Sequence, residues 1–453
     1  MAFQLDGLVS GMDTTAVIQS ILDAERIPIL RKENEIYELE DKMTAWNRLD
    51  TKITDLKTHA SKLNSYLTWQ QKSATIDDED VVTATADRTA YSNLYSIDVS
   101  QLAQAHRIAS DEQSSISSDL GLDGDFTVGG ETITVSTGDT LTDIRDAINT
   151  AASDMDDDEK VVASIIGKTL VIERASTGDT DLTISDGTNT ILDSLGVFTG
   201  GGIKTELQTS EDLAAQINGV DITSTSNNDV EDAMEGVTLN LKKVGSTTLT
   251  IDNDTETIKQ LLTDFIESYN DTMSLVKDAG TVVLDEEDEE SITGLGLLQD
   301  DLLVTRIATR SRGILTGIEF DPAILDQDYN TLQKIGIWTE GQDNALAIVD
   351  EDKLDDVLEN NFDELEDLIR DLESGVMFKF NDYLDSLISP IDGTIEQRKT
   401  NIQSKIDDIN EMITDFDRKE ESREEQLRQK FTRMEEVLST INSQGSAVLT
   451  YLG

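Results

Sequence analysis

The last stretch of the chain decides the fold, and its residues 402–441 read IQSKIDDINEMITDFDRKEESREEQLRQKFTRMEEVLSTI. Apolar residues recur there every three or four positions between charged ones, which predicts a long helix with a heptad stripe over 395–452. The spacing from Arg423 to Leu427 to Phe431 is four after four, a stutter that relaxes a supercoil locally. A helix this long buries its stripe only against a partner. The apolar stripe positions are Ile402, Ile406, Ile409, Ile413, Phe416, Leu427, Phe431, Met434, Leu438 and Ile441. Midway, charged Glu420 and Arg423 occupy the stripe.

A second stripe lies near the start of the chain. Asp13 precedes Val17 and Ile18, which predicts a helix cap and a first helical face, and Pro28 is expected to interrupt or kink that helix. Beyond Pro28 a second long helix is predicted, because apolar residues again recur at spacings of three or four. Antiparallel or bundled association between the two ends is the simplest way to bury both stripes. The second stripe is Ile36, Leu39, Met43, Trp46, Leu49, Ile53, Leu56, Ala60, Leu63 and Leu67.

Between these ends the apolar period changes to that of strands. Runs such as 237–241 and 247–251 are rich in Val, Thr, Leu and Ile, and 126–135 reads as a hairpin around Gly129-Gly130. The fold class predicted is α+β multidomain, with long helical coiled-coil legs formed by both termini and nested β-rich head domains in the middle. Further predicted elements are helices at 302–315, 354–372 and 376–388, and a strand pair at 335–338 and 345–348.

Composition excludes several classes of function. Asp and Glu number 92 against 36 Lys and Arg, a formal charge of −56. Nucleic acids and anionic membranes require basic surfaces, so we expect neither as a partner. The charge is typical of a protein kept soluble in a salty or extracellular setting. There is no cysteine, and no run approaches the roughly 20 apolar residues of a membrane span. The chain start lacks a basic region and a long apolar core, so if the chain is exported we expect it not to use a cleaved signal peptide.

The sequence offers no assembled set of catalytic groups, and we predict that the chain is not an enzyme. The two histidines, His59 and His106, lie near no recognisable nucleophile motif. The acidic start Asp252-Asn253-Asp254 has Thr257 where a calcium loop needs glycine, so it reads as a turn between strand and helix. No cofactor and no metal ligand set is predicted.

Four parts of the sequence together resemble one family. They are Gly7-Leu8-Val9-Ser10-Gly11-Met12-Asp13; Gly236–Leu241 followed by the helix with Phe265–Asn270; Leu332–Ile337 with Asp350–Leu354; and Arg423–Leu438 with Gln444–Ala447. Over essentially its full length the chain resembles the bacterial flagellar filament cap proteins, also called hook-associated protein 2. The first two segments are the most specific, since a heptad helix alone fits many proteins.

The resemblance implies a structural protein at the distal end of the flagellar filament, outside the cell. Its copies would form a ring, a pentamer or hexamer, beneath which exported flagellin folds and inserts. Implied partners are flagellin, further copies of the chain, hook–filament junction proteins and an export chaperone, with export through the flagellar type III apparatus. The implied domains are 1–40 with 395–453 (terminal helical region), 41–75 with 257–394 (leg), 76–108 with 209–256 (inner head) and 109–208 (outer head insert).

Two alternatives stay open at the level of sequence. A hook–filament junction protein or a flagellin-like subunit also pairs helical termini around a β-rich insert, although the segment 236–270 favours the cap. An adhesin acting through the insert 109–208, with carbohydrate as its ligand, belongs to a different class. A glycan array on that insert would separate it from the others.

Overall fold

The computed structural model describes residues 11–281, 283–284, 292–294, 296–317, 329, 331–340, 345–372 and 374–452, with side chains through 447 except at 283–284 and 292–294. Residues 7–10 of the predicted opening segment therefore lie outside the described residues. The chain divides into two compact units, one of residues 1–68 and 256–453 and one of residues 69–255. The finer four-part division stays a prediction.

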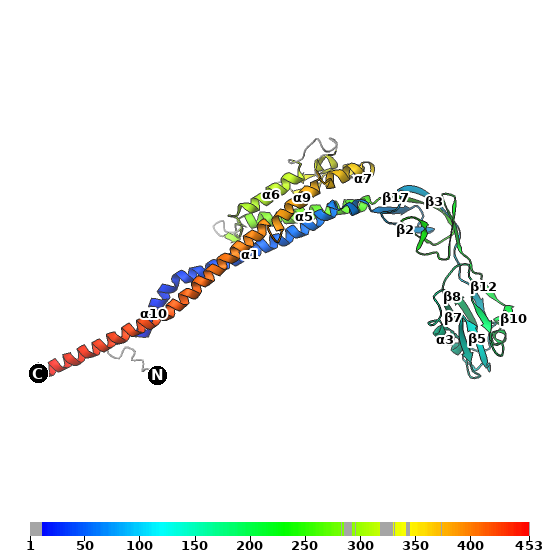
Figure 1. The fold of residues 1–453 in the computed structure, drawn as a ribbon, viewed down its shortest axis with the longest axis horizontal. Coiled ribbons are helices and arrows are strands. Elements are labelled where there is room, and N and C mark those ends of the chain that lie inside the picture. The colour runs from blue at the N-terminus through cyan, green and yellow to red at the C-terminus, as the bar shows by residue number, and fades with distance from the viewer. Residues whose placement is uncertain are drawn as a thin grey trace. The chain divides into compact units, whose positions relative to one another are not determined.

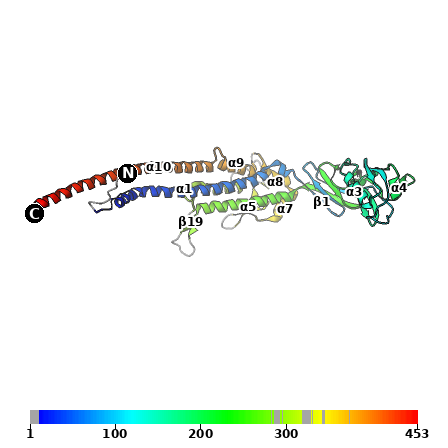
Figure 2. The same ribbon diagram turned by 90° about the horizontal axis from the view of Figure 1, so that it is seen from below.

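Two long helices dominate the first unit (Figures 1 and 2). Helix α1 spans Thr14–Asn64 and helix α10 spans Thr394–Leu452. Asp13 caps α1, because its carboxylate accepts a hydrogen bond from the Ala16 backbone N–H at 2.9 Å. In both views α1 (blue) and α10 (orange to red) run side by side, and the red end of α10 extends past the start of α1. The predicted terminal helices are therefore confirmed.

The two helices are antiparallel. The start of α1 packs against a late part of α10, where Ile18 and Leu22 meet Leu427. Farther along, Leu39 meets Ile406 and Ile409 from an earlier part of α10. Closer to the start of α10, Lys399 forms an ion pair of 2.9 Å with Asp50 of α1. Beyond it, the partner of α1 becomes the helix before α10.

That helix belongs to a bundle around the second half of α1. Its members are α5 (Thr255–Gly280), α6 (Leu302–Leu315), α7 (Glu351–Asn360), α8 (Phe362–Arg370) and α9 (Val376–Ile388). Lys57 and Ser61 of α1 bond to Asp385 and Asn381 of α9. Phe380 of α9 meets Phe265 of α5 edge-to-face, with ring centroids 5.7 Å apart. Smaller elements of this unit are α2 (Tyr66–Trp69), the 3-10 turn η1 (Leu332–Ile335), and the strand pairs β18 (Val283–Leu284) with β19 (Ile292–Gly294) and β20 (Ile337–Glu340) with β21 (Ala345–Ile348).

Three expectations about these helices were wrong. Pro28 lies inside α1 and does not interrupt it, so the two helices predicted on either side are one, while a kink at Pro28, the other expected outcome, stays a prediction. A proline removes one backbone hydrogen bond, a cost that the tertiary contacts on both sides of Pro28 outweigh. Leu67 does not join the stripe, because α1 ends at Asn64 and Leu67 is 55% exposed. The helix predicted over 354–372 is two helices, α7 and α8, separated at Asn361.

The second unit is built of antiparallel strands. Its five-stranded sheet has the order β1 (Lys72–Ile76), β17 (Gly245–Asn253), β3 (Asn93–Gln101), β13 (Leu213–Ile217) and β14 (Val220–Ser224). A three-stranded sheet has the order β15 (Val230–Met234), β16 (Val237–Leu241) and β2 (Val82–Ala86). The inward residues of both sheets, such as Ile97, Leu239 and Leu249, form one apolar core.

A separate core lies within residues 108–198. The four-stranded sheet there has the order β12 (Glu206–Gln208), β4 (Arg107–Ala109), β8 (Thr169–Arg174) and β7 (Val161–Ile166), and the three-stranded one has β6 (Glu131–Val135), β5 (Gly124–Val128) and β9 (Ile184–Asp186). Helices α3 (Leu141–Ala151) and α4 (Ile191–Leu195) complete it, beside the small pair β10 (Phe198–Thr199) and β11 (Gly202–Ile203). The predicted hairpin around Gly129-Gly130 is confirmed as β5–β6.

Candidate assembly surface on the terminal helices

The surface between α1 and α10 consists of two small apolar clusters. The distal cluster holds buried Ile18, Leu22 and Leu427, with Ile21 and Phe431 packed against it. The proximal cluster holds buried Leu39, Ile406 and Ile409, with Ile36, Ile402 and Ile413 beside it. Each cluster has only three buried side chains, so each holds its part of the helix pair by a small apolar area.

Between the two clusters lie the buried side chain of Ile29 on α1 and a set of ion pairs. Arg26 of α1 donates to Asp417 and Glu420 of α10, both at 3.0 Å, and to Glu33 on its own helix at 3.2 Å. Arg423 of α10 pairs with Glu25 of α1 at 3.2 Å. The charged residues that occupy the middle of the predicted stripe are thus bonded across the helix pair.

These ion pairs are partly open to water. The side chains of Arg26, Glu420 and Arg423 are 33%, 23% and 39% exposed. Its hydrogen bond to Asp417 raises the pKa of Arg26, so the group is a permanent cation. Exposed pairs of this kind contribute about 0.2–1 kcal/mol each, less than a buried leucine. The middle of the helix pair is therefore specific in register but weakly held.

Lys399 holds the end of the pair that leads to the bundle. Its ammonium group lies 2.9 Å from Asp50 of α1 and 2.8 Å from Glu396 of α10. Burial lowers the pKa of Lys399, but the hydrogen bonds to Glu396 and Asp50 outweigh it and leave the pKa raised. The group is 18% exposed, so this contact is the most enclosed of the ion pairs between α1 and α10.

The structure places the predicted stripe residues in three groups. The buried ones are Leu39, Trp46, Leu49, Ile53, Leu56, Ala60, Leu63, Ile406, Ile409 and Leu427. The half-buried ones are Ile36, Met43, Ile402, Ile413, Phe416, Phe431, Met434 and Leu438. Ile441 is 57% exposed. The stripe of α1 is thus shared, since its first part meets α10 and its second part meets the bundle.

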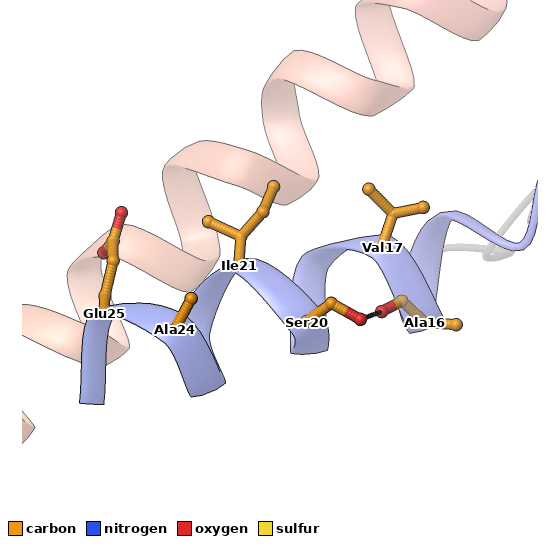
Figure 3. Close-up of a pocket in the computed structure, with 6 residues that line it drawn as sticks. All are labelled: Ala16, Val17, Ser20, Ile21, Ala24 and Glu25. Atoms are coloured by element: carbon orange, nitrogen blue, oxygen red, sulfur yellow. Dashed lines mark hydrogen bonds between the residues drawn. The ribbon is translucent and has the colours of Figure 1, made fainter. Parts of the chain in front are cut away.

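An apolar groove runs along the outer part of α1 (Figure 3). Val17, Ile21 and Glu25 stand one turn apart on α1, with Ala16, Ser20 and Ala24 beside them. Val17 is 38% exposed, whereas the Ser20 hydroxyl is occupied by a bond to the Ala16 carbonyl at 2.9 Å. Ile27 and Leu30 follow on α1, 49% and 48% exposed. The exposed apolar side chains of this part of α1 offer contact area beside the weakly held part of the helix pair.

Sequence reasoning missed Arg26 and Glu25. Their partners on α10 lie 391 to 398 residues away along the chain, so no local pattern shows the pairing. The only available signal was reciprocal charge, Glu25-Arg26 on one helix against Glu420 and Arg423 on the other. If the apolar clusters had been used to align the two helices antiparallel, Glu25 and Arg26 would have been placed opposite Arg423 and Glu420.

Neither histidine lies on this surface. His59 is half-buried and lines a small hollow between α1 and α5 together with Asp55 and Asp264. His106 is buried in the β-rich unit, where its Nδ1 accepts the Leu182 N–H at 2.8 Å. Among the described residues no group of three or more His, Asp or Glu side chains is arranged to hold a metal ion. No helix in the described part of the chain is long and apolar enough to cross a membrane.

The fold and this surface define a structural protein whose two ends pair as long helices while its middle is β-rich. Two parts of the sequence match known families: residues 10–106 match the flagellar hook-associated protein 2 N-terminus, and residues 210–443 match the flagellar hook-associated protein 2 C-terminus. The chain therefore belongs to the flagellar hook-associated protein 2 family, the filament cap proteins.

Similar proteins agree with this assignment. The A-type flagellar hook-associated protein 2 of Pseudomonas aeruginosa is 25% identical over 480 residues, which covers 97% of this chain and 95% of that protein. The flagellar hook-associated protein 2 of Salmonella typhimurium is 27% identical over 69% of this chain and 67% of its own length. The crystal structure of the Escherichia coli flagellar cap protein FliD, domains D1-D2-D3, superposes with a TM-score of 0.55 and 26% identity over 79% of this chain and 99% of that one.

Proposed function

We propose that this chain assembles as a ring at the distal end of a flagellar filament and assists the folding and insertion of exported flagellin there. Family membership supports the capping role. The observation that carries the mechanism is the α1–α10 pair, in which partly exposed ion pairs separate two small apolar clusters. No catalytic step and no cofactor is part of the proposal.

A weakly held helix pair suits this work. A cap stays on a growing filament only if its contacts below are released and remade each time a subunit is added. The distal cluster holds three buried side chains, and the ion pairs beside it contribute about 0.2–1 kcal/mol each. Opening the distal part of the pair therefore costs little, and the side chains that it uncovers, Ile18, Leu22 and Leu427, then become available to flagellin or to a neighbouring copy.

The remaining partners and the route follow the family. We propose that the chain leaves the cell through the flagellar type III apparatus, without a cleaved signal peptide and with an export chaperone, and works outside the cell beyond the hook–filament junction proteins. Flagellin is the substrate of its assembly work. Nucleic acid and membrane insertion have no place in it, given a charge of −56.

Electron microscopy and mass measurement of the purified chain test the ring. A closed ring, a pentamer or hexamer, is expected above a threshold concentration. A strict monomer at all concentrations, or long open filaments, would refute the proposal.

A pair of leucine substitutions tests the reversible leg. Glu420→Leu with Arg423→Leu replaces the bonded charges by apolar side chains between the two clusters, which should tighten the α1–α10 pair. In cells that lack their own cap protein, we expect this variant to support shorter filaments and to release more unpolymerised flagellin than the unaltered chain. The matched control is Arg418→Leu with Glu421→Leu, because both residues are exposed on α10 and neither is bonded to α1 in the described structure. Equal filament lengths for the two variants would remove the support for a reversible leg.

A further inference from the structure

Helix α6 carries a basic face in a chain that is otherwise strongly acidic. Its sequence, LLVTRIATRSRGIL, contains three arginines and no acidic residue. Arg306, Arg310 and Arg312 are exposed, and none of them forms an ion pair with a described residue. With 92 acidic residues against 36 basic ones in the chain, three arginines on 14 residues that form no ion pair with any described residue need an explanation.

The exposed residues of α6 lie on one side of the helix along its whole length. Leu303, Val304, Ile307, Ile314 and Leu315 point into the bundle and are buried. The opposite side is exposed from end to end, and at 100° per residue its members cover one arc. They are Leu302, Thr305, Arg306, Thr309, Arg310 and Arg312. The face therefore presents cations, hydroxyls and one apolar side chain in a single surface.

Neighbouring residues position two of the three arginines, Arg310 and Arg312. The Arg310 guanidinium lies over the ring of Tyr383 on α9, 5.2 Å from its centroid. Arg312 lines the opposite flank, in a hollow with Tyr269 and Lys277 of α5. Asp301 at the start of α6 is already occupied, since it caps the helix and pairs with Arg398 at 2.9 Å. The positive charge of the face is thus not cancelled by that carboxylate.

Helix α8 of the same unit presents the complementary charge. Asp363, Glu364 and Asp367 are exposed on it. Burial, and then the like charges of Asp371 and Asp363, raise the pKa of Asp367. Arg370 is the cation of this helix, and it is bonded to Glu366 at 2.7 Å. The acidic face of α8 therefore repels itself, and a basic partner would relieve that repulsion.

We propose that the basic face of α6 in one copy binds the acidic face of α8 in a second copy of the same chain. The two faces lie on different helices, so the contact joins unlike patches. Contacts of this heterologous kind produce a closed ring when the rotation between neighbours closes. The inference rests on the proposed ring and identifies the surfaces that would join its subunits.

The spacing of the side chains supports an antiparallel fit. Arg306 and Arg310 are one turn apart, about 6 Å along α6, and so are Asp363 and Asp367 on α8. Placing Arg306 opposite Asp367 brings Arg310 opposite Asp363. The same register brings Leu302, 79% exposed, toward Leu372, which is 70% exposed just beyond α8. Two ion pairs and one apolar contact then meet at matched positions.

Disulfide crosslinking between separately altered copies tests this contact. Because the chain has no native cysteine, only the introduced cysteines can form a disulfide. Protein with Arg306→Cys is mixed with protein carrying Asp367→Cys, allowed to assemble and oxidised. A disulfide-linked dimer of one copy of each is expected, and at least tenfold less of it when Arg88→Cys replaces Arg306→Cys. Arg88 is exposed on the β-rich unit and serves as the matched control. No mixed dimer from ring-forming protein would overturn the proposal, as would equal linkage within Arg306→Cys protein alone.

Charge reversal supplies the second measurement. Arg306→Glu with Arg310→Glu should raise the concentration for half-maximal assembly at least tenfold, about 1.4 kcal/mol. Asp363→Arg with Asp367→Arg should raise this concentration by a similar factor. All four changes in one chain should return the concentration for half-maximal assembly to within threefold of that of the unaltered chain. Arg88→Glu with Lys243→Glu alters the net charge equally, and should leave assembly within threefold of the unaltered chain.

The outcomes separate the two proposals. If the unaltered chain forms rings and both reversed variants assemble as well as it does, the α6–α8 contact is overturned and the capping ring stands. If the unaltered chain is a monomer at every concentration, both are overturned. A third outcome combines two results: the mixed dimer does not form, and neutralising the acidic run 285–290 restores assembly of the Arg306→Glu, Arg310→Glu variant. In that case the partner of α6 lies in the same chain, and the contact between copies is overturned.

Discussion

Leu427→Ala should open the distal end of the α1–α10 pair while leaving the rest of the chain folded. Leu427 is 7% exposed and is the only fully enclosed apolar residue that α10 contributes to the distal cluster. Ile18 and Leu22 contribute the other two buried side chains. Truncation to alanine removes three carbons from a cluster that has no other buried partner on α10.

The expected magnitude follows from burial. A buried leucine truncated to alanine costs about 2–5 kcal/mol, and the low end applies where the site can collapse. The distal cluster lies at the open end of a two-helix pair, so we expect about 2 kcal/mol. A loss of that size raises the population of the open state roughly 30-fold. The proximal cluster around Leu39 should be unaffected, because ion pairs separate it from the distal one.

Hydrogen exchange followed by mass spectrometry measures the opening directly. Amides of α1 between residues 16 and 26 should exchange roughly 30-fold faster in Leu427→Ala, while amides between 36 and 50 keep their rates. Val437→Ala is the matched control, because Val437 lies on the same helix and is 58% exposed. Equal acceleration in both segments would show that the pair opens as one unit and would refute the separation into two clusters. No difference between the two variants would refute the role of Leu427.

Three further substitutions test other parts of the fold. Asn270→Ala should lower the free energy of unfolding of the bundle by about 2 kcal/mol in thermal melts, because the Asn270 amide bonds both the N–H and the carbonyl of Leu346 at 2.8 Å. Gly236→Ala should cost about 1–3 kcal/mol in denaturant titrations, because Gly236 has φ of +74° and a Cβ would lie 2.5 Å from the Ala90 nitrogen. Hydrogen bonds from Thr188 hold the pKa of Asp125 below its usual 3.8. The contribution of the Asp125 carboxylate to folding stability is therefore present above pH 3.8 and is lost as the pH falls through the lowered pKa. Asp125→Asn should therefore be less stable than the unaltered chain at pH 6, by a difference that shrinks as the pH falls below 3.8, and a difference that stays constant across melts from pH 6 downward would contradict this assignment.

Much of the helical architecture could be predicted from sequence because it depends on local period. The predicted bounds of 302–315 and 376–388 coincide with α6 and α9, and the late helix starts one residue before its predicted start. A spacing of three or four residues determines which side of a helix is apolar, whatever it packs against. Pro28 was misjudged for the same reason, since a local rule assigns its cost and only tertiary contacts outweigh it.

The choice of partner could not be predicted in this way. The stripe of α1 is uniform in sequence, yet Leu39 meets α10 whereas Lys57 and Ser61 bond α9. That change depends on where α9 ends and α10 begins, at the turn before Thr394, and not on any property of α1 itself. The basic face of α6 did have a sequence signal, because three arginines without an acidic neighbour stand out in so acidic a chain.

The acidity of the chain and the proposed contact between copies respond to salt in opposite directions. Repulsion among 92 carboxylates opposes the compact state of each copy, and salt weakens that repulsion over a screening length of about 8–10 Å. Salt weakens the attraction between Arg306 and a carboxylate of a second copy by the same mechanism. Stability of the single copy should therefore rise with salt, while the contribution of the α6 ion pairs to assembly falls. A subunit contact that persists in high salt would therefore be held by apolar side chains rather than by the ion pairs of α6.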